Sequence, residues 1–425
     1  MSTDEDLRKP PMSPDEELRS YNPIYNPMFP EYPSYTPMFS EYLRRTPTSP
    51  DEDLIRTIPG TPFPCIQIFR DYALRKAKEE NFVFSPCSIQ LALSLITNGA
   101  ASATLEVLLK FLEAENQEQL KSHASKLISA LTESFTEGPK LSFVGGVWVD
   151  QSKKLTPNFK YDAETIYKAK AEETVNEWAA ESTNGIIPSF LPEGSIDELT
   201  RVVLANALYF KGKWSDPFEN ERTKNLRFYR QGGGSVKVPF MSNSERQFIK
   251  TFDNLKVLKL PYSKSTLSMY ILLPHKRDGL GPLVEEVSSN PLFFEKYTSV
   301  WKSVRVGKFG VPKFKINYTF EASEVLKAMG LELCYSNFAD FGEMVVDGGI
   351  QVQKVYHGSY IEVEEEGTKA AACTSIRMGI MCCKSRPPPE IRIDFMADHP
   401  FMYVVKDDNS GMVLFMGHVV NPSLK

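Results

Sequence analysis

The histidine and cysteine side chains are the residues of this sequence best suited to nucleophilic catalysis or metal binding. Their spacing favours neither nucleophilic catalysis nor metal binding. No two of the five histidines are close enough in sequence to share one helix face as metal ligands. The six cysteines include a vicinal pair but no C-x-x-C spacing, which indicates free thiols. These residues are His123, His275, His357, His399 and His418, with Cys65, Cys87, Cys334, Cys373, Cys382 and Cys383. We therefore predict neither a metal nor a cofactor.

Enzymatic motifs are also missing from the sequence. It contains no G-x-S-x-G elbow of a hydrolase, no phosphate-binding G-x-x-x-x-G-K and no zinc-binding H-E-x-x-H. The glycine run Gly232–Gly234 has the composition of a hairpin tip. The sequence thus predicts a protein that is not an enzyme.

The most informative stretch is EEEGTKAAACTSIRMGIMCCKSR (Glu364–Arg386), which three prolines follow. A long segment so poor in turn and cap signals is expected to form a surface loop. Its even positions from Thr368 to Ile380 are small or apolar, whereas its odd positions include lysine, serine and arginine. This alternation is typical of a strand with one buried face, and no proline before Met381 removes a ladder hydrogen bond. The segment is therefore predicted to be a loop that can become a strand.

By composition, the chain divides into an N-terminal tail and a body. Residues 1–58 hold 10 of the 30 prolines and 11 acidic against 6 basic side chains, so of the 54 acids and 49 bases the body keeps 43 of each. The tail repeats TDEDLR, PDEELR and PDEDLIR, a composition that does not sustain a core. We predict a disordered extension over residues 1–60 and one folded domain over residues 61–425. The alternative for the tail is a docking or regulatory arm, since four Ser-Pro or Thr-Pro steps lie in it.

Composition also limits the partners and the compartment. A formally neutral body does not predict nucleic-acid binding, and no apolar run approaches the roughly 20 residues of a membrane-spanning helix. The first residues, MSTDEDLRKPP, do not resemble a secretion signal. We expect a monomer in the cytoplasm or nucleocytoplasm, with an extracellular location not excluded.

Hydrophobic periodicity predicts an α+β domain. Leu105–Leu112 and Leu120–Leu131 follow the repeat of two amphipathic helices. Strand-like runs come after this helical first third, and the chain ends on a hairpin around Lys406–Gly411. The predicted strands are Leu141–Val149, Val202–Phe210, Leu255–Leu260, Leu267–Leu273, Val304–Ile316, Glu390–Phe395, Phe401–Val405 and Met412–Val420. Helices followed by long strands indicate the α+β class.

The body of the sequence resembles the serpin family, and the likeness extends over roughly Cys65 to Pro422. The hinge EEGTKAAACTS resembles the start of that family's reactive loop. The other matching motifs are NFVFSPCSI (Asn81–Ile89), NALYFKGKW (Asn206–Trp214), VPKF (Val311–Phe314), LKAMGL (Leu326–Leu331), DHPFMYVV and LFMGHVVNP. The DHPF turn and the hinge resemble plant-type serpins most. The resemblance implies helices clustered around a large mixed β-sheet, further sheets, and an exposed reactive loop over about residues 364–390.

In serpins the reactive loop mimics a substrate, so the resemblance implies a suicide-substrate inhibitor of a serine or papain-like cysteine endopeptidase. The cleaved loop, held as an acyl-enzyme, inserts into the main sheet. The hinge residues would be Gly367, Thr368, Lys369, Ala370, Ala371 and Ala372. The family's spacing places the attacked bond at Met381–Cys382, which suits peptidases with an apolar primary pocket. The alternative bonds are Lys384–Ser385, the better basic one, Arg386–Pro387 and Arg377–Met378.

The resemblance also assigns residues that open the sheet. Ser85, Ser88, Asn206 and His357 match the family's shutter, where small or hydrogen-bonding side chains exchange partners as strands part. Trp214 matches the breach at which the loop enters the sheet.

Two hinge residues depart from the family's pattern. Lys369 stands where inhibitory serpins usually carry glutamate, and Cys373 where they usually carry alanine or serine. Lys369 has the exposed parity, so insertion should survive it. The alternative is a non-inhibitory serpin that acts as a binding, chaperone-like or storage protein. Oxidation of Cys373, Cys382 or Cys383 would add bulk to the loop and is a possible redox control.

Overall fold

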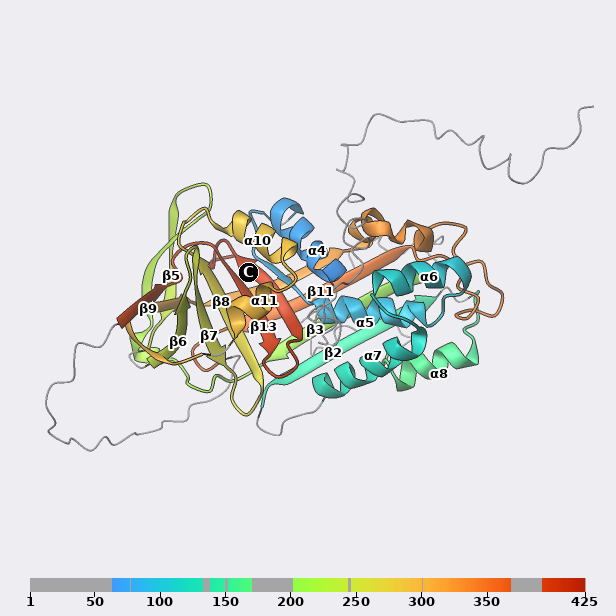
Figure 1. Ribbon diagram of the computed structural model, residues 1–425, viewed down its shortest axis with the longest axis horizontal. Helices are drawn as coiled ribbons and strands as arrows, with labels where there is room; N and C mark the ends of the chain where they lie inside the picture. The colour runs from blue at the N-terminus through green and yellow to red at the C-terminus, as the bar shows by residue number, and fades with distance from the viewer. Residues whose placement is uncertain are drawn as a thin grey trace, which may run out of the picture. The chain divides into compact units, whose positions relative to one another are not determined.

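The computed structural model describes residues 63–76, 78–132, 138–149, 152–169, 202–243, 246–299, 301–367 and 392–424 (Figure 1). The chain divides into two units, Met1–Arg45 and Thr46–Lys425, and all described residues belong to the second. Its helices are α4 Phe63–Asp71, α5 Pro86–Thr97, α6 Ser102–Phe111, α7 Gln117–Thr132, α8 Pro157–Thr165, α10 Leu280–Ser289, α11 Phe293–Thr298 and α12 Ser323–Leu326. The predicted extension over residues 1–60 lies outside the described residues.

Strands make two sheets in this part of the chain. They are β1 Phe82–Phe84, β2 Lys140–Val149, β3 Val202–Lys211, β4 Lys224–Tyr229, β5 Ser235–Met241, β6 Arg246–Thr251, β7 Leu255–Pro261, β8 Leu267–Pro274, β9 Val304–Pro312, β10 Phe314–Glu321, β11 Lys354–Val363, β12 Arg392–Met396, β13 Phe401–Asp407 and β14 Val413–Val419. The larger sheet has the order β1-β14-β13-β8-β7-β6-β9-β5-β4, with β12 paired to β9. The smaller has the order β10-β11-β3-β2. The predicted α+β class is confirmed.

In the four-stranded sheet, one pair of neighbours is parallel. β11 runs parallel to β3, from Lys354 opposite Val203 to Tyr360 opposite Tyr209, while β10 and β2 pair antiparallel on either side. A parallel ladder is slightly less stable per residue than an antiparallel one. The sheet therefore has its weakest seam at its centre, between β3 and β11.

Helix α5 lies under this seam and is almost wholly buried. It starts at an N-cap, Ser85, whose hydroxyl accepts a hydrogen bond from the N–H of Ser88 at 3.3 Å, and Pro86 fills the first helical position. Figure 1 shows α5 beside β3 and β2, which it contacts. The serine-proline-x-serine motif thus places two small polar side chains directly against the sheet.

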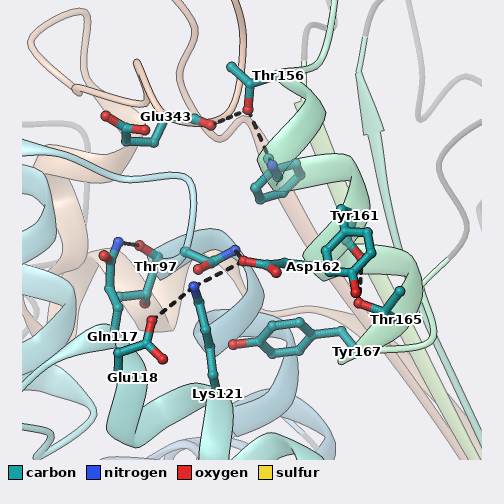
Figure 2. A network of polar contacts seen from close by, with 12 residues as sticks. Thr97, Gln117, Glu118, Lys121, Thr156, Tyr161, Asp162, Thr165, Tyr167 and Glu343 are labelled. Atoms are coloured by element: carbon teal, nitrogen blue, oxygen red, sulfur yellow. Dashed lines mark hydrogen bonds and ion pairs between the residues drawn. The ribbon is translucent and has the colours of Figure 1, made fainter.

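Helices α7 and α8 are tied to each other by a polar network (Figure 2). Lys121 on α7 pairs with Asp162 on α8 at 3.0 Å. The hydroxyl of Thr156, the N-cap of α8, accepts from the N–H of Phe159 at 3.3 Å and donates to the carbonyl of Glu343 at 2.6 Å. Since α7 also packs on β2, the network supports the β2 edge of the four-stranded sheet.

The hairpin predictions are confirmed, and one strand prediction is wrong. β13 and β14 form the expected terminal hairpin, and Gly232–Gly234 join β4 to β5 with φ of 78°, 105° and 77°. Val304–Ile316 is not one strand, because the chain changes sheets at Lys313: β9 belongs to the larger sheet and β10 to the smaller. The apolar positions shift from odd numbers at Phe309 and Val311 to even numbers at Phe314 and Ile316, a change of parity that the prediction of one strand overlooked.

Candidate functional site

The candidate site begins where β11 ends, at the turn Glu364–Gly367. The N–H of Glu364 and the N–H of Gly367 each donate to the other residue's carbonyl, at 3.1 and 3.2 Å. Gly367 has a φ of 114° and pairs with Lys213, just past the end of β3. A Cβ at Gly367 would lie 2.1 Å from the carbonyl oxygen of Gly212. Only glycine fits this turn. The turn places Gly367, the last described residue before position 368, at the end of the β3–β11 seam.

The substitution Gly367→Ala is expected to lower the melting temperature of the intact protein. The methyl group must push the turn away from the Gly212 carbonyl, and a left-handed φ adds backbone strain of about 1–3 kcal/mol. Differential scanning calorimetry measures the shift. Gly281→Ala is the matched control, because its Cβ would meet nothing within 4 Å. Equal melting temperatures for the two variants would contradict the close approach.

Trp214 holds this turn from the β3 side. Its backbone N–H donates to the carbonyl of Glu366 at 3.1 Å, and its indole N–H donates to the carbonyl of Glu364 at 2.9 Å. The ring is 3% exposed and stacks on Tyr262 at 4.6 Å. The predicted breach residue therefore lies at the turn that precedes the loop. Its role in loop entry stays a prediction.

The buried carboxylate of Glu365 also holds the Glu364–Gly367 turn in place, and the sequence did not predict this contact. It accepts hydrogen bonds from the Lys313 ammonium and from the Thr223 hydroxyl, both at 2.8 Å. Burial by itself would raise the pKa of Glu365, but these two hydrogen bonds, a backbone hydrogen bond and the charge of Lys313 together outweigh it and hold that pKa below its usual value. Lys313 is the residue at which the chain changes sheets, so the ion pair joins the β9–β10 crossing to the turn after β11.

The substitution Glu365→Gln is expected to lower the free energy of unfolding by about 2 kcal/mol at pH 7, because two hydrogen bonds to a charged group are weakened. A carboxylate whose folded pKa is depressed stabilises above its unfolded pKa, here 4.5, and loses that contribution as the pH falls through the folded pKa. The difference between the two proteins should therefore shrink below about pH 4.5. Urea unfolding at pH 7 and pH 4 measures it.

Glu364→Gln is the matched control for this experiment, since Glu364 lies 4.0 Å from the same Lys313 ammonium. It should cost little at either pH. If both substitutions cost the same, the Glu365 ion pair does not fasten the turn.

Four predicted shutter residues meet beneath the centre of the seam. His357 of β11 lies opposite Asn206 of β3, and its Nδ1 hydrogen-bonds the Asn206 side-chain oxygen. The Ser88 hydroxyl donates to that oxygen at 3.0 Å. The Ser85 backbone N–H donates to His357 Nε2 at 3.1 Å, and the Ser359 hydroxyl lies 2.8 Å from the same nitrogen. Ser359 was not predicted, although it follows His357 by two residues and so shares its face of the strand.

The cluster fixes the charge of its histidine. Because Nε2 accepts from the Ser85 N–H, the proton of the neutral ring is on Nδ1, from which it is donated to Asn206. Burial lowers the pKa of His357 to about 3, so the ring is neutral at physiological pH. Among the described residues, the Asn206 amide nitrogen has no hydrogen-bond partner. One buried donor on the seam therefore remains unsatisfied while β3 and β11 are paired.

Several predicted site residues lie outside the described residues. They are the hinge residues Thr368, Lys369, Ala370, Ala371 and Ala372, the bond Met381–Cys382, its alternatives at 377–378, 384–385 and 386–387, and Cys373 and Cys383. The described cysteines, Cys65, Cys87 and Cys334, are buried free thiols, and burial raises the pKa of Cys87 to about 11.

The described residues hold no group of three or more His, Cys, Asp or Glu side chains that could bind a metal ion. In the same part of the chain, no helix has the length and apolarity needed to cross a membrane.

Comparisons with known proteins agree with this arrangement. A sequence profile described as "Serpin (serine protease inhibitor)" matches residues 64–422. Serpin-Z1C of Triticum aestivum is 45% identical over 370 residues, 82% of this chain and 92% of that protein. Serpin-ZXA of Oryza sativa subsp. japonica is 45% identical over 366 residues, 81% and 91% of the two chains. The structure of Arabidopsis AtSerpin1 in its native stressed conformation matches with a TM-score of 0.77 and 35% identity, covering 89% of this chain and 100% of that one.

Proposed function

We propose that this chain, which belongs to the serpin family and to its plant type, is itself a suicide substrate that traps its target peptidase. Serpins are a family of protease inhibitors rather than catalysts. The target is a serine endopeptidase or a papain-like cysteine endopeptidase. The trap is the insertion of the cleaved segment that starts at Thr368 into the seam between β3 and β11.

The observation that carries this proposal is the geometry of the seam. The chain leaves β11 at Val363, turns through Glu364–Gly367 and stands opposite Lys213 at the end of β3. A segment that runs back from there between the two strands is antiparallel to both. Insertion thus replaces one parallel ladder by two antiparallel ones, which are more stable per residue.

The chemistry of trapping follows from the attacked bond. The peptidase nucleophile attacks the Met381 carbonyl, the bond to Cys382 breaks, and the new amine of Cys382 leaves with the C-terminal fragment. The peptidase stays joined to Met381 as an ester or thioester. The arm from Thr368 to Met381 then has a free end and can enter the seam, with its small and apolar even positions toward the core.

The buried cluster supports opening at this position. His357 and Asn206 are joined across the two strands that must part, and α5 supplies Ser85 and Ser88 as alternative partners from below. The unpaired Asn206 amide nitrogen gains a candidate acceptor when a new strand carries its carbonyls into the seam. Opening the seam therefore exchanges hydrogen bonds in this cluster rather than only breaking them.

Incubation with chymotrypsin, elastase, trypsin and papain tests the proposal. A covalent adduct that survives denaturing electrophoresis is expected with a peptidase that has an apolar primary pocket, together with a released peptide whose mass corresponds to Cys382–Lys425. A peptide that starts at Ser385 would assign the Lys384–Ser385 bond instead. Cleavage without any adduct would overturn inhibition and favour the non-inhibitory alternative.

A further inference from the structure

The face of the β3–β11 seam that is turned away from α5 carries a pair of tyrosines. Tyr209 of β3 is the direct partner of Tyr360 of β11, and their ring centroids lie 5.5 Å apart at an interplanar angle of 41°. Asn206 and His357 each precede one tyrosine by three residues, so the tyrosines project from the face opposite to the buried cluster. Side chains therefore join the two strands on both faces, by hydrogen bonds on one and by aromatic rings on the other.

Within β3 and β11, these rings are the one pair of large side chains that meet across that face. Each of the other direct pairs on it contains at least one small or aliphatic side chain. They are Val203 with Lys354, Ala205 with Tyr356 and Ala207 with Gly358. Because cross-strand side-chain pairs are what stabilise a sheet beyond its ladder, the attraction on this face is concentrated in Tyr209 and Tyr360.

Tyr360 is held in position from the β10 side of the seam. Its hydroxyl donates to the Glu362 carboxylate at 2.8 Å, and Glu362 is the direct partner of Lys315 in β10. The Lys315 ammonium lies 5.2 Å from the centroid of the Tyr360 ring, which is 5% exposed. These partners stay on the same side as Tyr360 when β3 and β11 part. Opening the seam thus breaks the contact with Tyr209 and leaves the others in place.

The pair lies close to the end of the seam at which the loop begins. Tyr209 precedes Lys213, the partner of Gly367, by four residues, or about 13 Å of strand. A strand inserted between β3 and β11 places them about 9.6 Å apart, twice the usual spacing. Aromatic rings interact up to a centroid distance of roughly 7 Å. The two rings therefore separate before an inserting strand reaches Asn206 and His357.

We propose that Tyr209 and Tyr360 are positioning residues that latch the seam, and that the loss of their contact limits the rate at which a strand enters it. This inference rests on the proposed function, because a latch matters only if the seam opens. The tyrosines act through the two strands that they join and not by contact with a peptidase. The latch keeps β3 paired with β11 while the loop is intact.

The test measures how fast the intact chain takes up a synthetic, fluorescein-labelled peptide with the sequence of residues 368–381. Uptake requires the seam to open but requires neither a peptidase nor a cut, and native electrophoresis in reducing buffer follows it. The variants are Tyr209→Val, Tyr360→Val and the double variant. Tyr360→Phe keeps the ring. Tyr161→Val, which changes an exposed tyrosine of α8, is the matched control.

Each single valine variant is expected to take up the peptide about fivefold faster than wild type, whereas Tyr360→Phe and Tyr161→Val should stay within about twofold of it. The double variant should also be about fivefold faster, because the second substitution removes a contact that the first has already broken. Wild-type rates in all variants overturn the latch. So do independent effects that multiply to about twenty-fivefold in the double variant.

Failure of the latch and failure of the proposed function give different results. If wild type takes up the peptide and forms an adduct with a peptidase, while the valine variants keep the wild-type rate, the latch is wrong and the trap stands. If no protein takes up the peptide and cutting the loop yields no adduct, the seam does not open, and the trap and the latch are both overturned.

Discussion

Replacing Thr368 by arginine is expected to abolish covalent trapping while leaving cleavage of the loop intact. Thr368 is the first even position after the turn at Gly367, so the proposed register of insertion sends its side chain into the core first. An unpaired guanidinium in that position costs several kcal/mol. Each 1.4 kcal/mol slows insertion about tenfold, so hydrolysis of the acyl-enzyme should overtake it by a factor of a hundred or more.

The stoichiometry of inhibition and the fraction of adduct on denaturing gels measure this outcome. Lys369→Arg is the matched control, since it places the same guanidinium one residue later, on the exposed parity, and should trap as well as wild type. If Thr368→Arg also trapped normally, the even positions would not face the core and the proposed register of insertion would be wrong.

The buried imidazole of His357 predicts a second large effect, a loss of stability in mild acid. Burial lowers the pKa of His357 to about 3, whereas the unfolded chain has the ordinary value of 6.5. Between these two values the unfolded state binds the proton and the folded state does not. This contribution to stability is complete above pH 6.5 and falls by about 1.4 kcal/mol for each pH unit below it, or about 3 kcal/mol at pH 4.5.

Urea unfolding of wild type and His357→Asn at pH 7.5 and pH 4.5 measures this effect. The variant is less stable at pH 7.5, because the ring's hydrogen bonds to Ser85 and Asn206 are altered, but its loss on acidification should be smaller by about 3 kcal/mol. The exposed His275, changed to asparagine, should keep the wild-type dependence. Equal losses in wild type and His357→Asn would show that the ring is not held neutral.

Local patterns predicted part of the fold, but not β11, the strand that carries His357. The leucine repeats predicted α6 and α7, and the alternating runs predicted β7, β8 and the terminal hairpin β13–β14. The resemblance of a few motifs selected Ser85, Ser88, Asn206 and His357, which the structure brings into one hydrogen-bonded cluster. The motif around Ser85 is a helix cap, a local signal that needs no knowledge of distant contacts.

The sequence did not predict the contacts between segments that lie far apart in the chain. Glu365 meets Thr223, 142 residues away, and Lys313, 52 residues away, and neither pairing has a local signature. The change of sheets at Lys313 coincides with a shift of the apolar positions from odd (Val311) to even (Phe314), and the prediction of one strand where two exist overlooked this shift.

The most direct test of the central claim compares the melting temperatures of the intact chain and of the chain cut at the reactive loop. A ten-residue strand that completes two ladders contributes about 1 kcal/mol for each new hydrogen bond, besides the burial of its apolar face. At about 2 °C per kcal/mol, the cut protein should melt about 20 °C or more above the intact one. A cut protein that melts at or below the temperature of the intact protein would contradict insertion into the β3–β11 seam.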